Sequence, residues 1–233
     1  LEVYIERIRR EYNCECLIGE PRVAYRERPT KEVAFNHRHK KQTGGAGQFA
    51  HVVGRMVPLS DEAEESYEFV NEVRQGRIPT QYIPSVNAGF KRAIVKGPLC
   101  ECEVVGVQMI LEDGSYHEVD SSEKAFNIAA FNCLRNLLKQ AKVALQEPIM
   151  KLEAVTPDEF LGNIQADLNA RRAAIISSKR RGDLCVLEAE AALSQMFGYS
   201  TQVRSLSQGR ASHSMEPLKY APAPPQVLED IMG

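Results

Sequence analysis

The spacing of apolar residues along the chain predicts successive strands and helices. Residues 23–59 and 66–73 have strand-like patterns, with a glycine-rich break at 42–48. Residues 83–94 instead carry apolar side chains on one face of a helix, and Pro84 suits its first turn. This mixture predicts an α+β fold.

The segment after residue 100 contains the strongest local signal in the chain. Alternating apolar residues at 105–111 predict a half-buried strand, and a loop follows at 112–119. Asp120 and Glu123 then form a capping-box pattern before a helical apolar stripe. The pattern predicts a helix over about 121–145, on the order of 35 Å long, that Pro148 ends.

The chain beyond residue 146 predicts a compact ferredoxin-like domain, because its elements follow the strand and helix order of a split βαβ unit. Thr156 and Glu159 suggest a second capping box, with Pro157 at the first helical position. Pro217 requires the last strand to be an edge or to contain a bulge. The predicted strands are 149–156, 173–178, 184–193 and 211–220, the helices lie around 161–168 and 196–206, and a stiff proline-rich tail follows.

Composition is that of a globular protein. The 233 residues are 43% hydrophobic, and the formal net charge of −2 neither supports nor excludes nucleic-acid binding. No apolar run approaches the roughly 18 residues of a membrane span, and no leader is apparent. We therefore expect a cytoplasmic, monomeric protein that does not bind membranes.

The cysteines lack the spacing of a zinc site. Two Cys-x-Cys pairs are tighter than the usual Cys-x2-4-Cys, so the favoured interpretation is reduced thiols on alternate strand positions, and we expect no metal. The six cysteines are Cys14, Cys16, Cys100, Cys102, Cys133 and Cys185.

The glycine-rich break does not have the pattern of a nucleotide-binding loop. A P-loop places its lysine after the glycines and at the start of a helix. Here Lys40 and Lys41 come before Gly44, Gly45 and Gly47, and a strand-like segment follows. The pattern argues against mononucleotide binding.

A hydrolytic triad is also disfavoured. His117, Asp120, Ser121 and Ser122 include the required residue types, but Asp120 and the serines lie where a helix needs capping. His117 follows a turn, so we expect it to be exposed and available to a ligand.

RNA is the remaining candidate ligand for this part of the chain. Five basic or titratable residues at 37–41 adjoin glycines that allow close backbone approach. If the loop at 42–48 and the loop at 112–117 were adjacent, Gln48 and His117 would lie among these charges. Single-stranded or distorted RNA would be a natural partner for such a surface. A solvated basic strand with an ordinary hairpin turn explains the same residues equally well.

Five longer motifs carry a resemblance to a known family. Together they resemble the C-terminal part of elongation factor G, a ribosomal translocase, nearly from end to end. The motifs are HKKQTGGAGQFAHVV, IPTQYIPSV, DGSYHEVDSSEKAFNIAA, EPIMKLE and MFGYSTQVRSLSQGRASHSME.

The resemblance implies a domain organisation. Residues 1–19 are expected to be the remnant of the family's third, ferredoxin-like domain, 20–145 an S5-like fourth domain, and 146–233 a ferredoxin-like fifth domain. GTP and Mg²⁺ are expected in a GTPase domain that this sequence does not contain, so we expect no cofactor and no catalysis here.

The resemblance also implies partners and site residues. The fourth domain is expected to enter the decoding centre of the small ribosomal subunit, through loops matching 43–49 and 113–119, and to contact tRNA and mRNA. The fifth is expected to contact large-subunit RNA near the GTPase centre, although a solvated face explains its cations equally well. The implied tip residues are Lys40, Lys41, Gly44, Gly45, Gly47, Gln48, Tyr116 and His117, and the fifth-domain cations are Arg171, Arg172, Lys179, Arg180, Arg181, Arg204 and Arg210.

Some positions depart from the family pattern. Ala46, Phe49, Ala50 and Pro217 stand where serine, tyrosine, glycine and an aromatic residue are common. These departures suit a paralogue acting in ribosome recycling, whereas the intact GSYHEVDSSE segment argues against ribosome-protection proteins. An enzyme on an S5-like fold, such as a small-molecule kinase, is a further alternative that lacks its phosphate loop.

Overall fold

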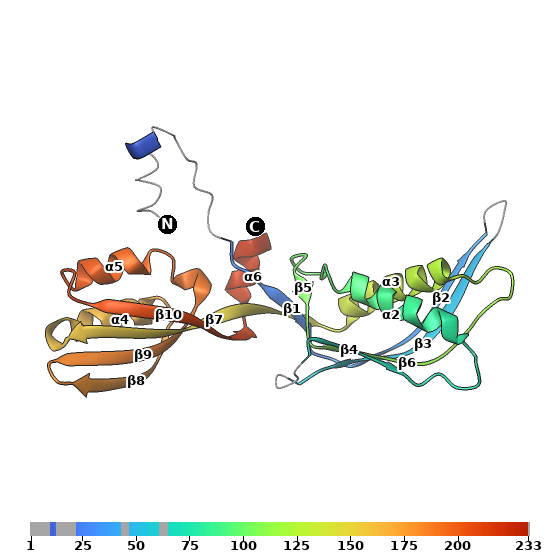
Figure 1. Cartoon of the computed structure of the whole chain (residues 1–233), viewed down its shortest axis with the longest axis horizontal. Coiled ribbons are helices and arrows are strands. Elements are labelled where there is room, and N and C mark those ends of the chain that lie inside the picture. The colour runs from blue at the N-terminus through green and yellow to red at the C-terminus, as the bar shows by residue number, and fades with distance from the viewer. Residues whose placement is uncertain (1–9, 13–21, 43–46, 61–64, 233) are drawn as a thin grey trace.

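The computed structural model describes residues 10–12, 22–42, 47–60 and 65–232. These residues form two β-sheets with helices packed on them (Figure 1), so the predicted α+β class is confirmed. The domain remnant expected over residues 1–19 lies outside the described residues, except for 10–12, which are helical.

A four-stranded sheet and two helices make up the first region (Figure 1). β2, β3 and β6 are antiparallel neighbours, and β4 pairs in parallel with β6. The helices α2 and α3 pack on the sheet around fully buried side chains such as Phe90, Met109 and Phe126. The elements are β2 Val33–Lys41, β3 Gln48–Pro58, β4 Tyr67–Asn71, η1 Thr80–Tyr82, α2 Ile83–Ala93, β6 Val107–Ser115 and α3 Glu123–Gln140.

The second region is built around one long strand, β7, Val143–Pro157. Its C-terminal part lies between β10 and β9, and β8 completes this part of the sheet; the order β10-β7-β9-β8 fits the predicted split βαβ unit. The start of β7 pairs instead with β1, which pairs with β5. The elements are β1 Arg26–Pro29, β5 Glu103–Val104, η2 Asp158–Phe160, α4 Leu161–Ala170, β8 Ala174–Arg181, β9 Leu184–Ala192, η3 Leu193–Gln195, α5 Tyr199–Leu206, β10 Ser212–Pro222 and α6 Pro225–Met232.

The end predicted for the long helix was wrong. α3 ends at Gln140, and Lys142 adopts a left-handed φ of 49° before β7 begins. Residues 143–146 are taken by pairing with β1 instead of continuing the helix. Pro148 lies inside β7 opposite Tyr220 of β10, between the residues that pair with β1 and those that pair with β9. β7 therefore runs through the predicted domain boundary at residue 145, and the boundaries themselves stay predictions.

Both predicted capping boxes were wrong in their cap residue. Ser122 caps α3, because its Oγ accepts the Ala125 N–H at 3.1 Å. Thr156 is fully buried and donates to the Pro157 carbonyl, and α4 begins at Leu161, after a 3-10 turn. The sequence pattern could not register these competing local hydrogen bonds.

Two strand predictions also need correction. The strand predicted over 105–111 is interrupted at Gly106, whose φ of 71° separates β5 from β6. β6 then continues to Ser115, so half of the predicted 112–119 loop is strand. At the other end of the chain, Pro217 adjoins a bulge in β10, which pairs only with β7 among the described strands, as predicted. The tail beyond β10 contains the unpredicted helix α6.

Candidate nucleic-acid interface

The β2–β3 hairpin provides one of two loops at the end of the first sheet. The strands remain paired as far as Lys41 and Gln48, and we name the connection between them, residues 42–47, the first tip loop. Gly44 and Gly45 lie outside the described residues. The second tip loop, residues 116–122, connects the end of β6 to α3. The sequence alone leaves open whether these loops are adjacent.

Hydrogen bonds join the two tip loops directly. Asp120 accepts the Gly47 N–H at 3.1 Å through Oδ1 and the Phe49 N–H at 2.9 Å through its backbone carbonyl. The Ser121 hydroxyl donates to the Phe49 carbonyl at 2.7 Å. A Cβ on Gly47 would lie 2.8 Å from Asp120 Oδ1, so any other residue at this position would displace the Asp120 carboxylate. The loops therefore form one bonded unit.

His117 is oriented by its own loop. Its Nδ1 accepts the N–H groups of Val119 and Asp120, each at 3.3 Å, and its backbone N–H donates to Ser121 Oγ at 2.9 Å. Because Nδ1 accepts these hydrogen bonds, the ring N–H lies at Nε2. The side chain is 57% exposed. The second loop thus presents a donor to solvent on a fixed ring.

Gln48 is held from the opposite side of the hairpin. Its Oε1 lies 3.0 Å from His39 Nε2, across the last residues of β2 and the first of β3. The Gln48 side chain is half-buried, and its amide N–H₂ has no hydrogen-bond partner among the described residues. Tyr116, the neighbour of His117, is 43% exposed. The structure therefore brings Gly47, Gln48 and His117 together at one end of the sheet.

The predicted basic residues follow β2 toward the first tip loop. Arg38 and Lys40 are exposed on one face of β2, and Lys41 is its exposed last residue. Two histidines of the same hairpin, His37 and His51, are partly buried. Burial lowers the pKa of His37 and also, helped by Arg38, the pKa of His51. At neutral pH these two rings are therefore uncharged, and the basic character of β2 comes from its arginine and lysines.

The predicted cations of the second region are dispersed, and several are engaged by acidic neighbours. Arg180 pairs with Asp158, and Arg210 pairs with Glu159. Arg172 Nη2 lies 4.0 Å from Glu147 Oε2. Among the predicted cations, all of which are described, those without a salt-bridge partner in the described part of the chain are Lys179, Arg181 and Arg204, on β8 and in the last turn of α5.

Arg171 makes more hydrogen bonds within the fold than the other predicted cations of this region, among the described residues. Its Nε donates to Asp167 at 2.9 Å, and Nη1 donates to the carbonyls of Gln195 and Phe197 at 2.7 and 3.2 Å. The guanidinium also lies 5.4 Å from the centroid of the Tyr199 ring. Arg171 therefore ties α4 to the connection before α5, and these donors are directed to the fold.

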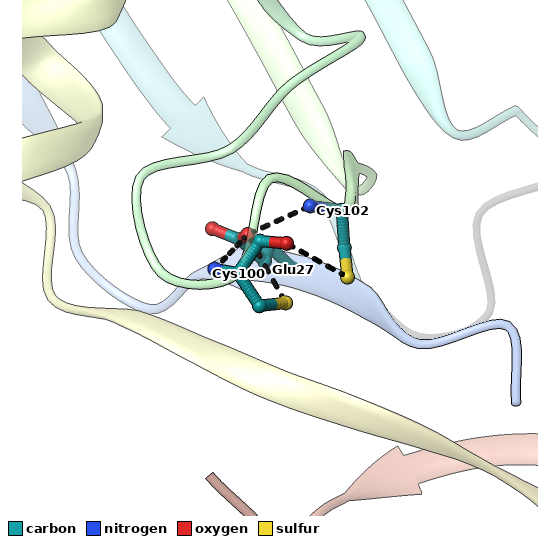
Figure 2. Close-up of side chains that lie close together, drawn as sticks. All are labelled: Glu27, Cys100 and Cys102. Carbon is teal, nitrogen blue, oxygen red and sulfur yellow. Dashed lines mark hydrogen bonds between the residues drawn. The ribbon is translucent and has the colours of Figure 1, made fainter. Parts of the chain in front are cut away.

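One group of side chains has the composition of a metal site. Glu27, Cys100 and Cys102 place their ligand atoms within 4.8 Å of one another (Figure 2). The cysteines lie in the loop before β5, so the prediction of alternate strand positions was wrong for this pair, and Cys14 and Cys16 lie outside the described residues.

The contacts of the Glu27 carboxylate favour a different role for this group. The buried carboxylate accepts the N–H groups of Cys100 and Cys102 at 2.9 and 3.2 Å (Figure 2). It also accepts the Leu99 N–H at 3.0 Å, so the loop already occupies both carboxylate oxygens. Burial, assisted by Cys102, raises the pKa of the Cys100 thiol to about 12, which keeps it protonated at neutral pH. A Cβ on Gly97 would lie 2.2 Å from the carboxylate. The Glu27 carboxylate therefore holds the tight loop before β5 in place through its three N–H donors.

Sequence reasoning missed the residues that link the tip loops. Asp120 and Ser121 had been assigned to capping α3, and His39 had been counted only as part of a basic run. The signal available in the sequence was a glycine in one loop and an acidic residue in the other. Only the fold shows that Gly47 lies next to Asp120. No described helix combines the length and apolar character needed to cross a bilayer.

Comparison with known proteins identifies relatives over almost the whole chain. A family model described as "Elongation factor G, domain IV" matches residues 21–142, and one described as "Elongation factor G C-terminus" matches residues 144–231. The chain is 49% identical, over 233 residues and 100% of its length, to Elongation factor G of Rhodopirellula baltica, of which it covers 34%. It is 45% identical over 232 residues to Elongation factor G of Thermotoga maritima, covering 100% of this chain and 34% of that protein.

A solved structure from Thermus thermophilus has the same fold. It matches with a TM-score of 0.86 at 35% sequence identity, and the match covers 99% of this chain and 34% of that one. The chain therefore spans about a third of the length of the relatives it matches.

Proposed function

We propose that this chain, which belongs to the elongation factor G family, is the ribosome-binding C-terminal part of a translation elongation factor. In this proposal the factor promotes GTP-dependent translocation of tRNA and mRNA. The two tip loops enter the decoding centre of the small subunit, and the second region contacts RNA of the GTPase centre in the large subunit. GTP and Mg²⁺ are bound by a domain outside this chain, which itself catalyses no reaction.

The observation that carries the proposal is the orientation of His117. Two backbone N–H groups occupy Nδ1, so the exposed ring offers its Nε2–H outward. The unpartnered amide nitrogen belongs to Gln48, the first residue of β3, which directly follows the first tip loop. Two donors held at the same end of the sheet suit contacts to the sugar and base edges of RNA, which sequence-specific and shape-specific RNA recognition both use.

The support behind the tip loops suits a mechanical role. α3 begins one residue after the second tip loop and is fixed there by its Ser122 cap. One face of α3 is buried against the sheet over its whole length. A loop anchored on a packed helix and a strand pair keeps its donors in position when it is pushed against RNA.

The test uses a chimera in which this chain replaces the matching third of the Rhodopirellula baltica factor. Gln48→Ala and His117→Ala are introduced singly, and movement of tRNA on the ribosome is measured separately from GTP turnover. We expect movement to slow about two- to tenfold, because a hydrogen bond to a neutral sugar or base edge contributes about 0.5–1.5 kcal/mol. GTP turnover should be unchanged.

Gln81→Ala is the matched control, because Gln81 is an exposed glutamine of η1 outside both tip loops. It should leave both rates unchanged. Unchanged tRNA movement in both tip variants would falsify the tip assignment. A chimera that separates ribosomal subunits but does not move tRNA would instead assign the chain to a recycling factor.

A further inference from the structure

The ends of α2 and α3 that point away from the tip loops carry a second group of positive charges. Arg92, Lys96 and Arg135 line a hollow of about 430 Å³ together with Phe131 and Glu101. Lys139 lines an adjoining hollow with Lys96 and Arg135. Four cations and one carboxylate thus face one surface of a chain whose net charge is −2. We name Arg92, Lys96, Arg135 and Lys139 the helix-end cluster.

The acidic residue does not neutralise this cluster. Glu101 pairs with Lys96 at 2.8 Å, and both side chains are at least 70% exposed. Arg92, Arg135 and Lys139 form no salt bridge with a described residue, and all three are exposed. Three positive charges therefore remain in excess around the hollow, where they repel one another unless an anion lies among them.

An aromatic ring gives the cluster a stacking surface. The guanidinium carbons of Arg92 and Arg135 lie 4.4 and 5.6 Å from the centroid of the Phe131 ring. Phe131, Arg135 and Lys139 are spaced four residues apart, so they form one stripe of α3. Guanidinium groups held over a ring keep their N–H edges available for phosphate and present a flat surface to bases.

Helix stabilisation accounts for only part of the cluster. Arg92 and Lys139 lie in the last turns of α2 and α3, where cations complement the helix dipole. Arg135 lies more than a turn before the end of α3, and Lys96 lies beyond the end of α2. Arg135 and Lys139 are moreover like charges at i and i+4, a spacing that disfavours the helix.

We propose that the helix-end cluster is a second RNA-binding surface, which takes the phosphate backbone of an RNA strand with a base against the Arg92–Phe131–Arg135 stack. It is separate from the tip loops, because Arg135 is 12 residues into α3 and so roughly 18 Å from its start. The inference goes beyond the proposed function, since no tip residue takes part in it.

The test measures binding of a fluorescein-labelled 16-nucleotide polyuridine strand to the full 233-residue chain by anisotropy, at several KCl concentrations. Arg135→Gln/Lys139→Gln should weaken binding about tenfold at about 0.1 M salt. It should also reduce the slope of log affinity against log salt by about 1.4, because each phosphate contact on a single strand contributes about 0.7. Glutamine keeps the helix propensity of α3.

Lys31→Gln/Arg74→Gln is the matched control. It removes one lysine and one arginine that are exposed on the same region and form no salt bridge with a described residue. It should change affinity less than twofold. Equal losses in the two double variants would overturn the inference, because they would show attraction by overall charge only. No loss in either would overturn it as well.

Two further arms distinguish RNA binding at the helix-end cluster from an acidic protein partner and from binding at the tip loops. The first arm tests whether polyglutamate displaces the RNA at equal charge concentration and binds the Arg135→Gln/Lys139→Gln chain as weakly as RNA does. Both results together would assign the cluster to an acidic protein and overturn the RNA assignment. Gln48→Ala/His117→Ala removes the proposed tip contacts without removing a lysine or an arginine, so it should lower the affinity without changing the slope of log affinity against log salt. If this tip variant alone weakens binding, the second surface is excluded while the proposed function stands.

Discussion

The tip loops and the cations of the second region differ in what their polar groups do. At the tip loops, Asp120 and Ser121 satisfy neighbouring backbone groups, and the Gln48 amide nitrogen and the His117 Nε2 have no partner among the described residues. In the second region Arg171 directs its donors to Asp167 and to two carbonyls of the fold. The second region has more of the predicted cations, but the donors of Arg171 are bonded within the fold and are not available to RNA.

This difference shows why a count of charges is a weak guide to a binding site. A cation held in an ion pair and in backbone hydrogen bonds contributes to packing, and its donors are not available to RNA. A histidine and a glutamine add nothing to a count of lysines and arginines, but at the tip loops their side chains are held by hydrogen bonds and retain a nitrogen without a partner in the described chain. We therefore expect substitutions in the second region to change stability and substitutions at the tip loops to change function.

The largest effect on stability is expected from Arg171→Ala. It removes one charge-assisted hydrogen bond and two bonds to carbonyls from a side chain that is 19% exposed. We expect the free energy of unfolding in urea to fall by about 3 kcal/mol, because hydrogen bonds to charged groups contribute about 1.5–3 kcal/mol and are not additive.

Arg181→Ala is the control for this prediction. Arg181 is exposed at the end of β8 and has no salt-bridge partner among the described residues. Its removal should change the free energy of unfolding by no more than about 0.5 kcal/mol. Similar losses in the two variants would contradict the division between structural and available cations.

Much of the fold follows from apolar spacing. The stripes that predicted α2 and α3, and the alternation that predicted β9, all correspond to buried faces. Element ends were less predictable, because long-range pairing decided them. Residues 143–146 have a helical pattern but pair with β1, and α6 follows a proline-rich segment that suggested an extended tail.

The candidate site was only half visible in the sequence. Its outward residues, Gln48 and His117, could be named from loop position and resemblance. Two residues could not be named: His39, which holds Gln48, and Asp120, which joins the second tip loop to Gly47. Their partners are 9 and 73 residues away and meet only in the folded chain. The Phe131 stack was missed for the same reason, since α2 supplies Arg92 to a ring on α3.

The next effect in size is expected from Asp120→Ala, which sharpens the comparison at the tip loops. The change leaves the Gly47 N–H without its acceptor in a part-buried position. We expect a loss of about 1–2 kcal/mol in the free energy of unfolding and faster hydrogen exchange at Gly47. Asp120→Asn keeps an acceptor oxygen and should lose less than half as much. An equal loss for Asn and Ala would mean that the two loops are not joined through this bond.

The smallest effect is expected from His51→Gln and concerns pH. Burial, helped by Arg38 and Arg77 and opposed by Asp113, lowers the pKa of His51 in the folded chain. Between that value and the unfolded value of about 6.5, the unfolded chain binds more protons, so stability falls as the pH drops through this window.

Glutamine does not titrate and can still bond to Ser115 or Asn36, which contact the His51 ring at 3.0 and 2.7 Å. We therefore expect His51→Gln to have nearly wild-type stability at about pH 7.5 and a smaller loss of stability at about pH 5.5, both measured by urea unfolding. His37→Gln should act in the same direction, because burial also lowers the pKa of His37. The double variant His37→Gln/His51→Gln combines the two changes. If it loses as much stability on acidification as the wild type, the acid sensitivity does not come from this hairpin. The contrast between the neutral histidines of the hairpin and its exposed cations would then be wrong.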